Sequence, residues 1–280
     1  MMLHEKIGLG TVQFGTSYGI ANKIGQTPPA EVTRILDKAY ELGIRTIDTA
    51  SAYGKSEEVL GRNRMERFSV VSKFMPATAS QSVSQQLEQT LSHLQVSTLY
   101  GYLAHRPASL LEDTSQWKEL ESLKMQGRVQ KIGYSLNDPG ELESLLKLEM
   151  VPDLVQTPYN YLDQRFRQSL IELKNAGCEI HTRSAFLQGL FFLDTSALSP
   201  FFDEVKPIIG EAQKTYGESL PAVLLKYVLS RDFIDRVIMG VETEQQLISN
   251  LASINEAETI KDILPNISAS ILNPSCWPKK

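Results

Sequence analysis

The chain has 280 residues, of which 42% are hydrophobic and 22% charged, proportions that are ordinary for a globular protein. Its formal net charge of −5 argues against a nucleic-acid or anionic-membrane partner, because both favour a basic face. The first residues lack a signal-peptide core, and no apolar run reaches the roughly 18 residues of a membrane span. We therefore expect a cytoplasmic protein. Cys178 and Cys276 match no metal spacing and are interpreted as free thiols.

Short apolar runs alternate with longer amphipathic stretches along the whole chain. The apolar runs predict strands at 7–10, 44–48, 69–73, 99–105, 131–135, 154–156, 178–184 and 236–239. The amphipathic stretches predict helices at 31–43, 56–62, 80–94, 113–126, 140–148, 164–176, 203–216, 221–230 and 244–254. Each predicted strand is thus followed by at least one helix, which is typical of a parallel sheet.

Eight strand–helix units predict an α/β fold, a (β/α)8 TIM barrel, as a single domain over residues 1–280. The rival, an open doubly wound sheet, usually has fewer strands and a G-x-G-x-x-G turn after the first. Here the segment from Gly10 to Gly15 has the sequence GTVQFG instead. Residues 256–280 are expected to form an irregular tail that packs over the barrel.

Polar residues stand where the predicted strands end, which is where barrel active sites gather. They are Asp48, Lys73, His105, Ser135, Gln156 and the pair Arg183 and Ser184, with Tyr53 five residues after Asp48. Each alone could be a helix cap, a solvated lysine, a buried histidine or a rim aromatic. An acid, a base, a phenol and an imidazole at one barrel mouth together indicate a catalytic site.

The segment from Asp48 to Gly61, DTASAYGKSEEVLG, resembles the signature of the aldo-keto reductase family. Further segments resemble the family in the same order: 10–15, 70–73, 103–107, 127–135, 155–160 and 183–190. The resemblance runs from about residue 7 to residue 252. It implies that an aldehyde or ketone, a small-molecule partner, is reduced to an alcohol by hydride transfer from NAD(P)H.

The resemblance and the chemistry assign the same four catalytic residues. Hydride addition to a carbonyl leaves an alkoxide that needs a proton, and Tyr53 is the expected general acid. A free tyrosine has a pKa near ~10, and a nearby ammonium favours the phenolate. Lys73 would supply that ammonium and Asp48 would hold it, while His105 would orient the substrate carbonyl by a hydrogen bond. No metal ion is expected in this scheme.

The resemblance also implies a site for NADP(H), partly at the helix N-terminus after the last strand, where barrels often bind phosphate. The implied cofactor contacts are Gly10, Thr11, Ser135, Gln156, Arg183, Ser184, Phe186, Gly240, Thr243, Gln246 and Asn250.

Two departures from the family pattern affect this site. Glu242, Thr243 and Gln246 stand where many NADP-binding relatives have a basic residue. A carboxylate repels a 2′-phosphate but can accept a hydrogen bond from a ribose 2′-hydroxyl, so NAD(H) is the alternative cofactor. Leu136 follows Ser135 where many relatives have Asn to hold the carboxamide, and Asn137 comes one residue late.

Two other functions are compatible with these residues. Lys73 could form a Schiff base in an aldolase, although the neighbouring Asp48 works against it. The barrel could instead be a nicotinamide-nucleotide-binding redox sensor. Five aromatic residues are candidate pocket liners or core residues: Tyr18, Phe74, Phe191, Phe192 and Trp277. The sequence sets no oligomeric state.

Overall fold

The computed structural model describes residues 3–263 and 266–278. Its eight strands are all parallel and close into a barrel in the order β1 to β8, which confirms the predicted fold class. The strands are β1 (Ile7–Gly10), β2 (Thr46–Asp48), β3 (Ser69–Phe74), β4 (Leu99–Ala104), β5 (Val129–Ser135), β6 (Leu154–Pro158), β7 (Glu179–Arg183) and β8 (Arg236–Gly240).

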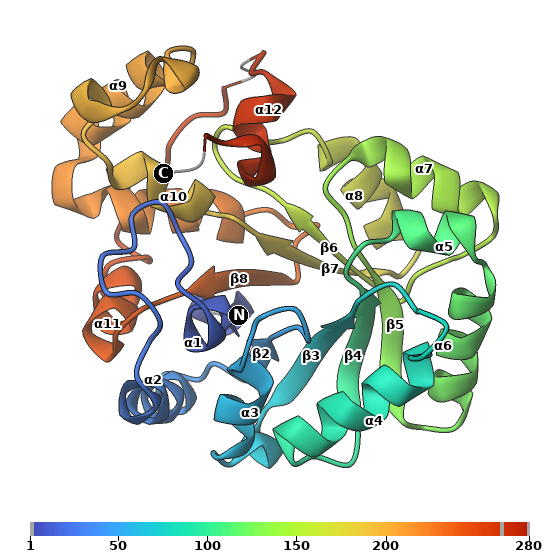
Figure 1. Cartoon of the computed structure of the whole chain (residues 1–280). Helices are drawn as coiled ribbons and strands as arrows, with labels where there is room; N and C mark the ends of the chain where they lie inside the picture. The colour runs from blue at the N-terminus through green and yellow to red at the C-terminus, as the bar shows by residue number, and fades with distance from the viewer. Residues whose placement is uncertain (1–2, 264–265, 279–280) are drawn as a thin grey trace.

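The longer helices form a layer outside the strands, as Figure 1 shows. The helices are α1 (Val12–Gly15), α2 (Pro29–Glu41), α3 (Ser56–Gly61), α4 (Val83–Leu94), α5 (Ala108–Glu112), α6 (Ser115–Met125), α7 (Pro139–Lys147), α8 (Arg167–Asn175), α9 (Lys206–Tyr216), α10 (Leu220–Leu229), α11 (Glu244–Ala252) and α12 (Ala269–Leu272). Three of them, α1, α5 and α12, were not predicted, because four or five residues are too few to show a helical period. No helix in the described part of the chain is long and apolar enough to cross a membrane.

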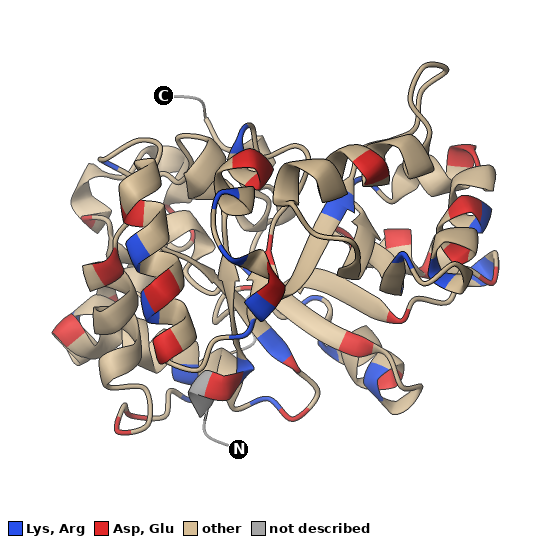
Figure 2. Cartoon of the chain, turned by 90° about the horizontal axis from the view of Figure 1, so that it is seen from below, with Lys and Arg blue, Asp and Glu red and all other residues tan. Residues whose placement is uncertain are grey.

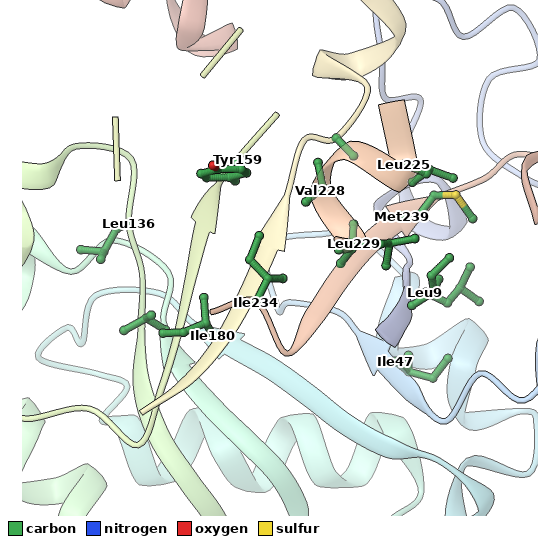
Figure 3. Close-up of a cluster of buried hydrophobic side chains, with 14 of the residues drawn as sticks. Leu9, Ile47, Leu136, Tyr159, Ile180, Leu225, Val228, Leu229, Ile234 and Met239 are labelled. Atoms are coloured by element: carbon green, nitrogen blue, oxygen red, sulfur yellow. The ribbon is translucent and has the colours of Figure 1, made fainter. Parts of the chain in front are cut away.

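The main core lies between the strands and the outer helices. In Figure 3, Leu225, Val228 and Leu229 of α10 lie close to β7 and β8. Because side chains alternate along a strand, each strand also sends residues into the barrel. Val71, Leu103 and Leu154 form a separate buried cluster there. Acidic and basic residues are interspersed along the outer helices, as Figure 2 shows.

The segment after α11 crosses towards the mouth of the barrel. Ile271 and Leu272 of α12 are buried, and Trp277 packs edge-on against Phe202 with ring centroids 5.1 Å apart. The Trp277 indole donates to the carbonyl of Ile271 at 2.8 Å. Residues 264–265 and 279–280 of the predicted tail lie outside the described residues.

Candidate active site

A cavity of about 570 Å³ opens at the carboxyl ends of the strands. Most of the predicted site residues line it: Gly10, Thr11, Asp48, Tyr53, His105, Ser135, Arg183, Ser184, Phe186, Gly240 and Gln246. Lys73, Gln156, Thr243 and Asn250 stand outside this lining. The ends of parallel strands in a barrel converge at one face, and this geometry brings distant segments together.

A buried ion pair lies at the base of the cavity. The Lys73 ammonium, which is 0% exposed, donates to Asp48 Oδ1 at 2.7 Å and to the carbonyl of Thr49 at 2.9 Å. Burial disfavours its charge, but Asp48 and the nearby Tyr53 outweigh burial and raise the pKa of Lys73. The side chain is therefore an ammonium throughout the neutral range.

Tyr53 is placed above this pair by a tightly packed turn between β2 and α3. Its ring centroid is 5.2 Å from Lys73 Nζ. The backbone of Gly15 touches the same turn so closely that a Cβ there would lie 1.7 Å from the Tyr53 carbonyl oxygen. Ser56 fixes the other side of the turn, because its hydroxyl donates to the Thr11 carbonyl at 2.9 Å. These contacts fix the backbone of the turn from which the Tyr53 side chain extends.

His105, the fourth of the predicted catalytic residues, follows directly after β4. Its ring meets Tyr53 edge-on, with ring centroids 5.7 Å apart. Burial, followed by the positive charges of Lys73, Arg183 and Arg106, lowers the pKa of His105 from 6.5 to about 3. The imidazole is therefore neutral, so one ring nitrogen carries hydrogen and the other accepts.

Arg183 connects the ends of β7 and β5. Its Nη2 donates to Asn137 Oδ1 at 2.6 Å and to the Leu136 carbonyl at 3.1 Å. Leu136 is 0% exposed within the hydrophobic core, whereas Asn137 lines the cavity. The structure thus brings to the cavity the asparagine that the sequence places one residue late.

The turn after β8 forms the opposite wall. Thr243 caps α11 by accepting from the Gln246 backbone amide at 3.1 Å. Gln246 Oε1 in turn accepts from the Glu242 backbone amide at 2.6 Å. Glu242 also lines the cavity, and burial raises the pKa of its carboxyl. Asn250 donates to Met239 Sδ at 3.6 Å behind this wall.

Gln13, on α1, is a cavity residue that the sequence analysis missed. A Cβ on Gly240 would lie 2.7 Å from Gln13 Oε1, so the glutamine amide packs against the glycine backbone. Gln13 Oε1 is buried and has no hydrogen-bond partner. Gln13 belongs to the GTVQFG segment that the sequence analysis singled out. Nothing in that segment separates Gln13 from its neighbours; only its contact with Gly240 in the folded chain does so.

The candidate aromatic liners divide into two groups. Tyr18 and Phe192 line the cavity, whereas Phe74 and Phe191 are buried in the core. Trp277 packs against Phe202, and it is the preceding segment Asn273–Ser275 that reaches the cavity. Tyr18 Oη accepts a 3.0 Å hydrogen bond from Gln188 Nε2, which joins the loop after β1 to the loop after β7.

Side chains that could bind a metal ion are not grouped in the described part of the chain. Among residues 3–263 and 266–278, no group of three or more His, Cys, Asp or Glu side chains is placed to hold a metal ion.

Comparisons with known proteins identify the class of protein. The model of the aldo/keto reductase family matches residues 6–265. The oxidoreductase YtbE of Bacillus subtilis is 24% identical over 86% of this chain and 84% of its own. The glyoxal reductase of Bacillus subtilis is 27% identical over 85% of this chain and 83% of its own. The solved structure of aldo-keto reductase AKR11C1 from Bacillus halodurans matches with a TM-score of 0.72 and 19% identity, and the match covers 91% of this chain and 88% of that one.

The chain belongs to the aldo/keto reductase family. It is therefore an NAD(P)H-dependent oxidoreductase of carbonyl compounds, as the sequence analysis predicted.

Proposed function

We propose that the protein reduces an aldehyde or ketone to an alcohol with Tyr53 as the general acid. The observation that carries the assignment is the buried ammonium of Lys73, held by Asp48 at 2.7 Å and lying 5.2 Å from the Tyr53 ring centroid. An ammonium next to a phenol stabilises the phenolate that remains after the proton has been given to the nascent alkoxide. The neutral imidazole of His105 donates a hydrogen bond to the carbonyl oxygen and orients it.

A reduced nicotinamide supplies the hydride when it is bound, and the residues of the cavity fit such a group. The Gln13 amide packs against the Gly240 backbone at the cavity, and its buried Oε1 still lacks a donor, which ribose hydroxyls offer. Arg183 provides a cation at the cavity wall. Gly10, Thr11, Ser135, Ser184, Phe186 and Gln246 complete the cofactor residues that contact the cavity.

Three residues expected to bind the cofactor would act less directly. Thr243 and Asn250 support the wall after β8 through their own contacts. Gln156 is fully buried and donates to Asp48.

The side chain of Glu242 supports NAD(H) as the preferred cofactor. Glu242 lines the cavity next to Gln246, a neutral residue, so a 2′-phosphate bound there would meet a carboxylate and no compensating cation from either residue. A ribose 2′-hydroxyl would find an acceptor at the same place.

A Schiff-base aldolase does not fit this geometry. Lys73 is fully buried, and Asp48 and Tyr53 raise its pKa, so the amine that must attack a carbonyl stays protonated.

The catalytic assignment is tested by replacing the phenol. We expect Tyr53→Phe to lower the rate of aldehyde reduction by about 100- to 10,000-fold, the range of general acid catalysis. Cofactor affinity, measured by quenching of protein fluorescence, should stay within about threefold of the parent. Tyr40→Phe, on the outer face of α2, serves as the matched control. A Tyr53→Phe protein with parental kcat would refute the role of Tyr53.

The cofactor assignment is tested by titrating NADH and NADPH side by side. NADH should bind more tightly, and Glu242→Lys should raise the NADPH-to-NADH affinity ratio by about tenfold or more, equivalent to ~1.4 kcal/mol. Glu218→Lys, exposed and outside the cavity lining, is the charge control. Tighter NADPH binding by the parent would reject the preference for NAD(H).

A further inference from the structure

Gln156 lies inside the barrel, directly above its apolar interior. It stands two residues after Leu154 on β6, so both side chains point to the same face of the sheet. Leu154 belongs to the interior cluster with Val71 and Leu103. Gln156 is 0% exposed and is not part of the cavity lining. Its Nε2 has a hydrogen-bond partner within the barrel, whereas its buried Oε1 has none.

Its partner comes from the opposite side of the barrel. Gln156 Nε2 donates to Asp48 Oδ2 at 2.7 Å. Asp48 ends β2, and β2 and β6 are four strands apart in either direction around the closed sheet. The amide therefore bridges the barrel interior rather than joining neighbouring strands.

The two oxygens of Asp48 have separate donors. Oδ1 accepts from the Lys73 ammonium and Oδ2 from the Gln156 amide, both at 2.7 Å. Because the carboxyl is only 3% exposed, solvent cannot easily replace either donor. The two bonds fix the rotation of the carboxylate, and the carboxylate in turn fixes the ammonium that faces Tyr53. A buried carboxylate oxygen without its donor would turn towards the remaining cation.

We propose that Gln156 is a positioning residue for proton donation, acting through Asp48 and Lys73 on Tyr53. The proposal rests on the proposed role of Tyr53. It differs from the cofactor contact that the family resemblance implies for Gln156. A pure cofactor contact would change cofactor affinity and leave the ionisation of the phenol untouched. A positioning residue changes the ionisation of the phenol even when no cofactor is present.

The test compares Gln156→Met with the parent in two measurements. Tyrosinate absorbance is followed against pH without cofactor, and the signal of one phenol is isolated by subtracting the same protein carrying Tyr53→Phe. The ionisation midpoint in this difference spectrum should rise by about half a pH unit or more, since Asp48 Oδ2 would then compete with the phenolate for Lys73. In turnover, kcat should fall about tenfold, while cofactor affinity stays within about threefold.

Gln156→Glu provides a second variant that keeps the shape of the side chain. A protonated glutamic acid at this position donates to Asp48, whereas an ionised one repels it. Relative to Gln156→Met, we expect higher kcat at the acid end of the profile and lower kcat as pH rises. Gln164→Met is the matched control, because Gln164, like Gln156, has a buried Oε1 without a partner, but its Nε2 donates to the Ile263 carbonyl, outside the cavity.

Loss of cofactor affinity by tenfold or more with an unchanged tyrosinate midpoint would overturn the positioning role in favour of a cofactor contact. The titration needs no turnover. A shifted midpoint in a protein that reduces no carbonyl compound would support the role of Gln156 and count against the proposed function, so the two failures are distinguishable.

Discussion

Replacing Asp48 with Asn should expose the cost of the charge buried in this barrel. The Lys73 ammonium is 0% exposed, and Asp48 is its anionic partner at 2.7 Å. Removing one member of a buried ion pair typically costs about 3–5 kcal/mol, because the remaining charge is left uncompensated. We expect a loss of free energy of unfolding in this range at pH 7, measured by urea unfolding followed by far-ultraviolet circular dichroism.

The loss should depend on pH in a defined direction. In the parent, the folded-state pKa of Lys73 is raised above 10.5, so its stabilisation is present below pH 10.5 and is lost as pH rises through the folded-state pKa. In Asp48→Asn, burial prevails and lowers the folded-state pKa of Lys73. The variant then gains stability as pH rises towards 10.5, and the difference from the parent should be smaller at pH 9.5 than at pH 7.

A surface ion pair gives the control for this experiment. Arg128 and Glu88 lie 2.7 Å apart with side chains 34% and 58% exposed, so Glu88→Gln should cost less than about 1 kcal/mol. A loss below about 1 kcal/mol in Asp48→Asn that is also equal at pH 7 and pH 9.5 would refute the reasoning.

Three further outcomes follow from the site. The pH profile of kcat/KM should show no inflection near 6.5 from His105, whose pKa is about 3; an inflection there that vanishes in His105→Gln would contradict this. Gly15→Ala should lower kcat by about 100-fold, because the added Cβ would displace the Tyr53 turn. Its control is Gly210→Ala in α9, where the nearest atom to the added Cβ, Thr195 Oγ1, is 3.7 Å away; this change should stabilise the protein by ~1 kcal/mol in urea unfolding. Tyr18→Phe removes the bond to Gln188 and should speed cofactor release about fivefold in stopped-flow fluorescence, equivalent to ~1 kcal/mol; an unchanged release rate would show that the two loops do not retain the cofactor.

The barrel was predictable because its signal repeats. Each of the eight apolar runs corresponds to a strand of the sheet, and the order of strands follows from the short connections. Strand ends were less accurate. The sequence predicts Ile44 as part of β2, but its amide donates to the Ala39 carbonyl at 2.9 Å, so this residue belongs to the turn that closes the C-terminal end of α2. An apolar residue packs equally well at a helix end or in a strand, and hydrophobicity alone does not separate the two.

The predicted catalytic residues converge because the ends of parallel strands meet at one face. The aromatic liners were harder, since residue type does not say which face of a strand a side chain takes. Lys73 points into the barrel, so its neighbour Phe74 must point outward into the helical layer, where it is 1% exposed. Once Lys73 is known to point into the barrel, alternation excludes Phe74 from the cavity lining. Trp277 follows β8 through a long connection, to which no strand alternation applies.

The same alternation explains the displaced asparagine at the end of β5. Ser135 lines the cavity, so Leu136 turns away from it and is buried in the core at 0% exposure. An amide at position 136 would lie among apolar side chains in this backbone, whereas position 137 returns to the cavity side and bonds Arg183 at 2.6 Å. The side-chain oxygen Oδ1 of Asn137 accepts from Arg183, so the side-chain amide is held with its nitrogen Nδ2 available as a donor. The one-residue shift thus keeps an amide at the mouth of the barrel and ties it to β7.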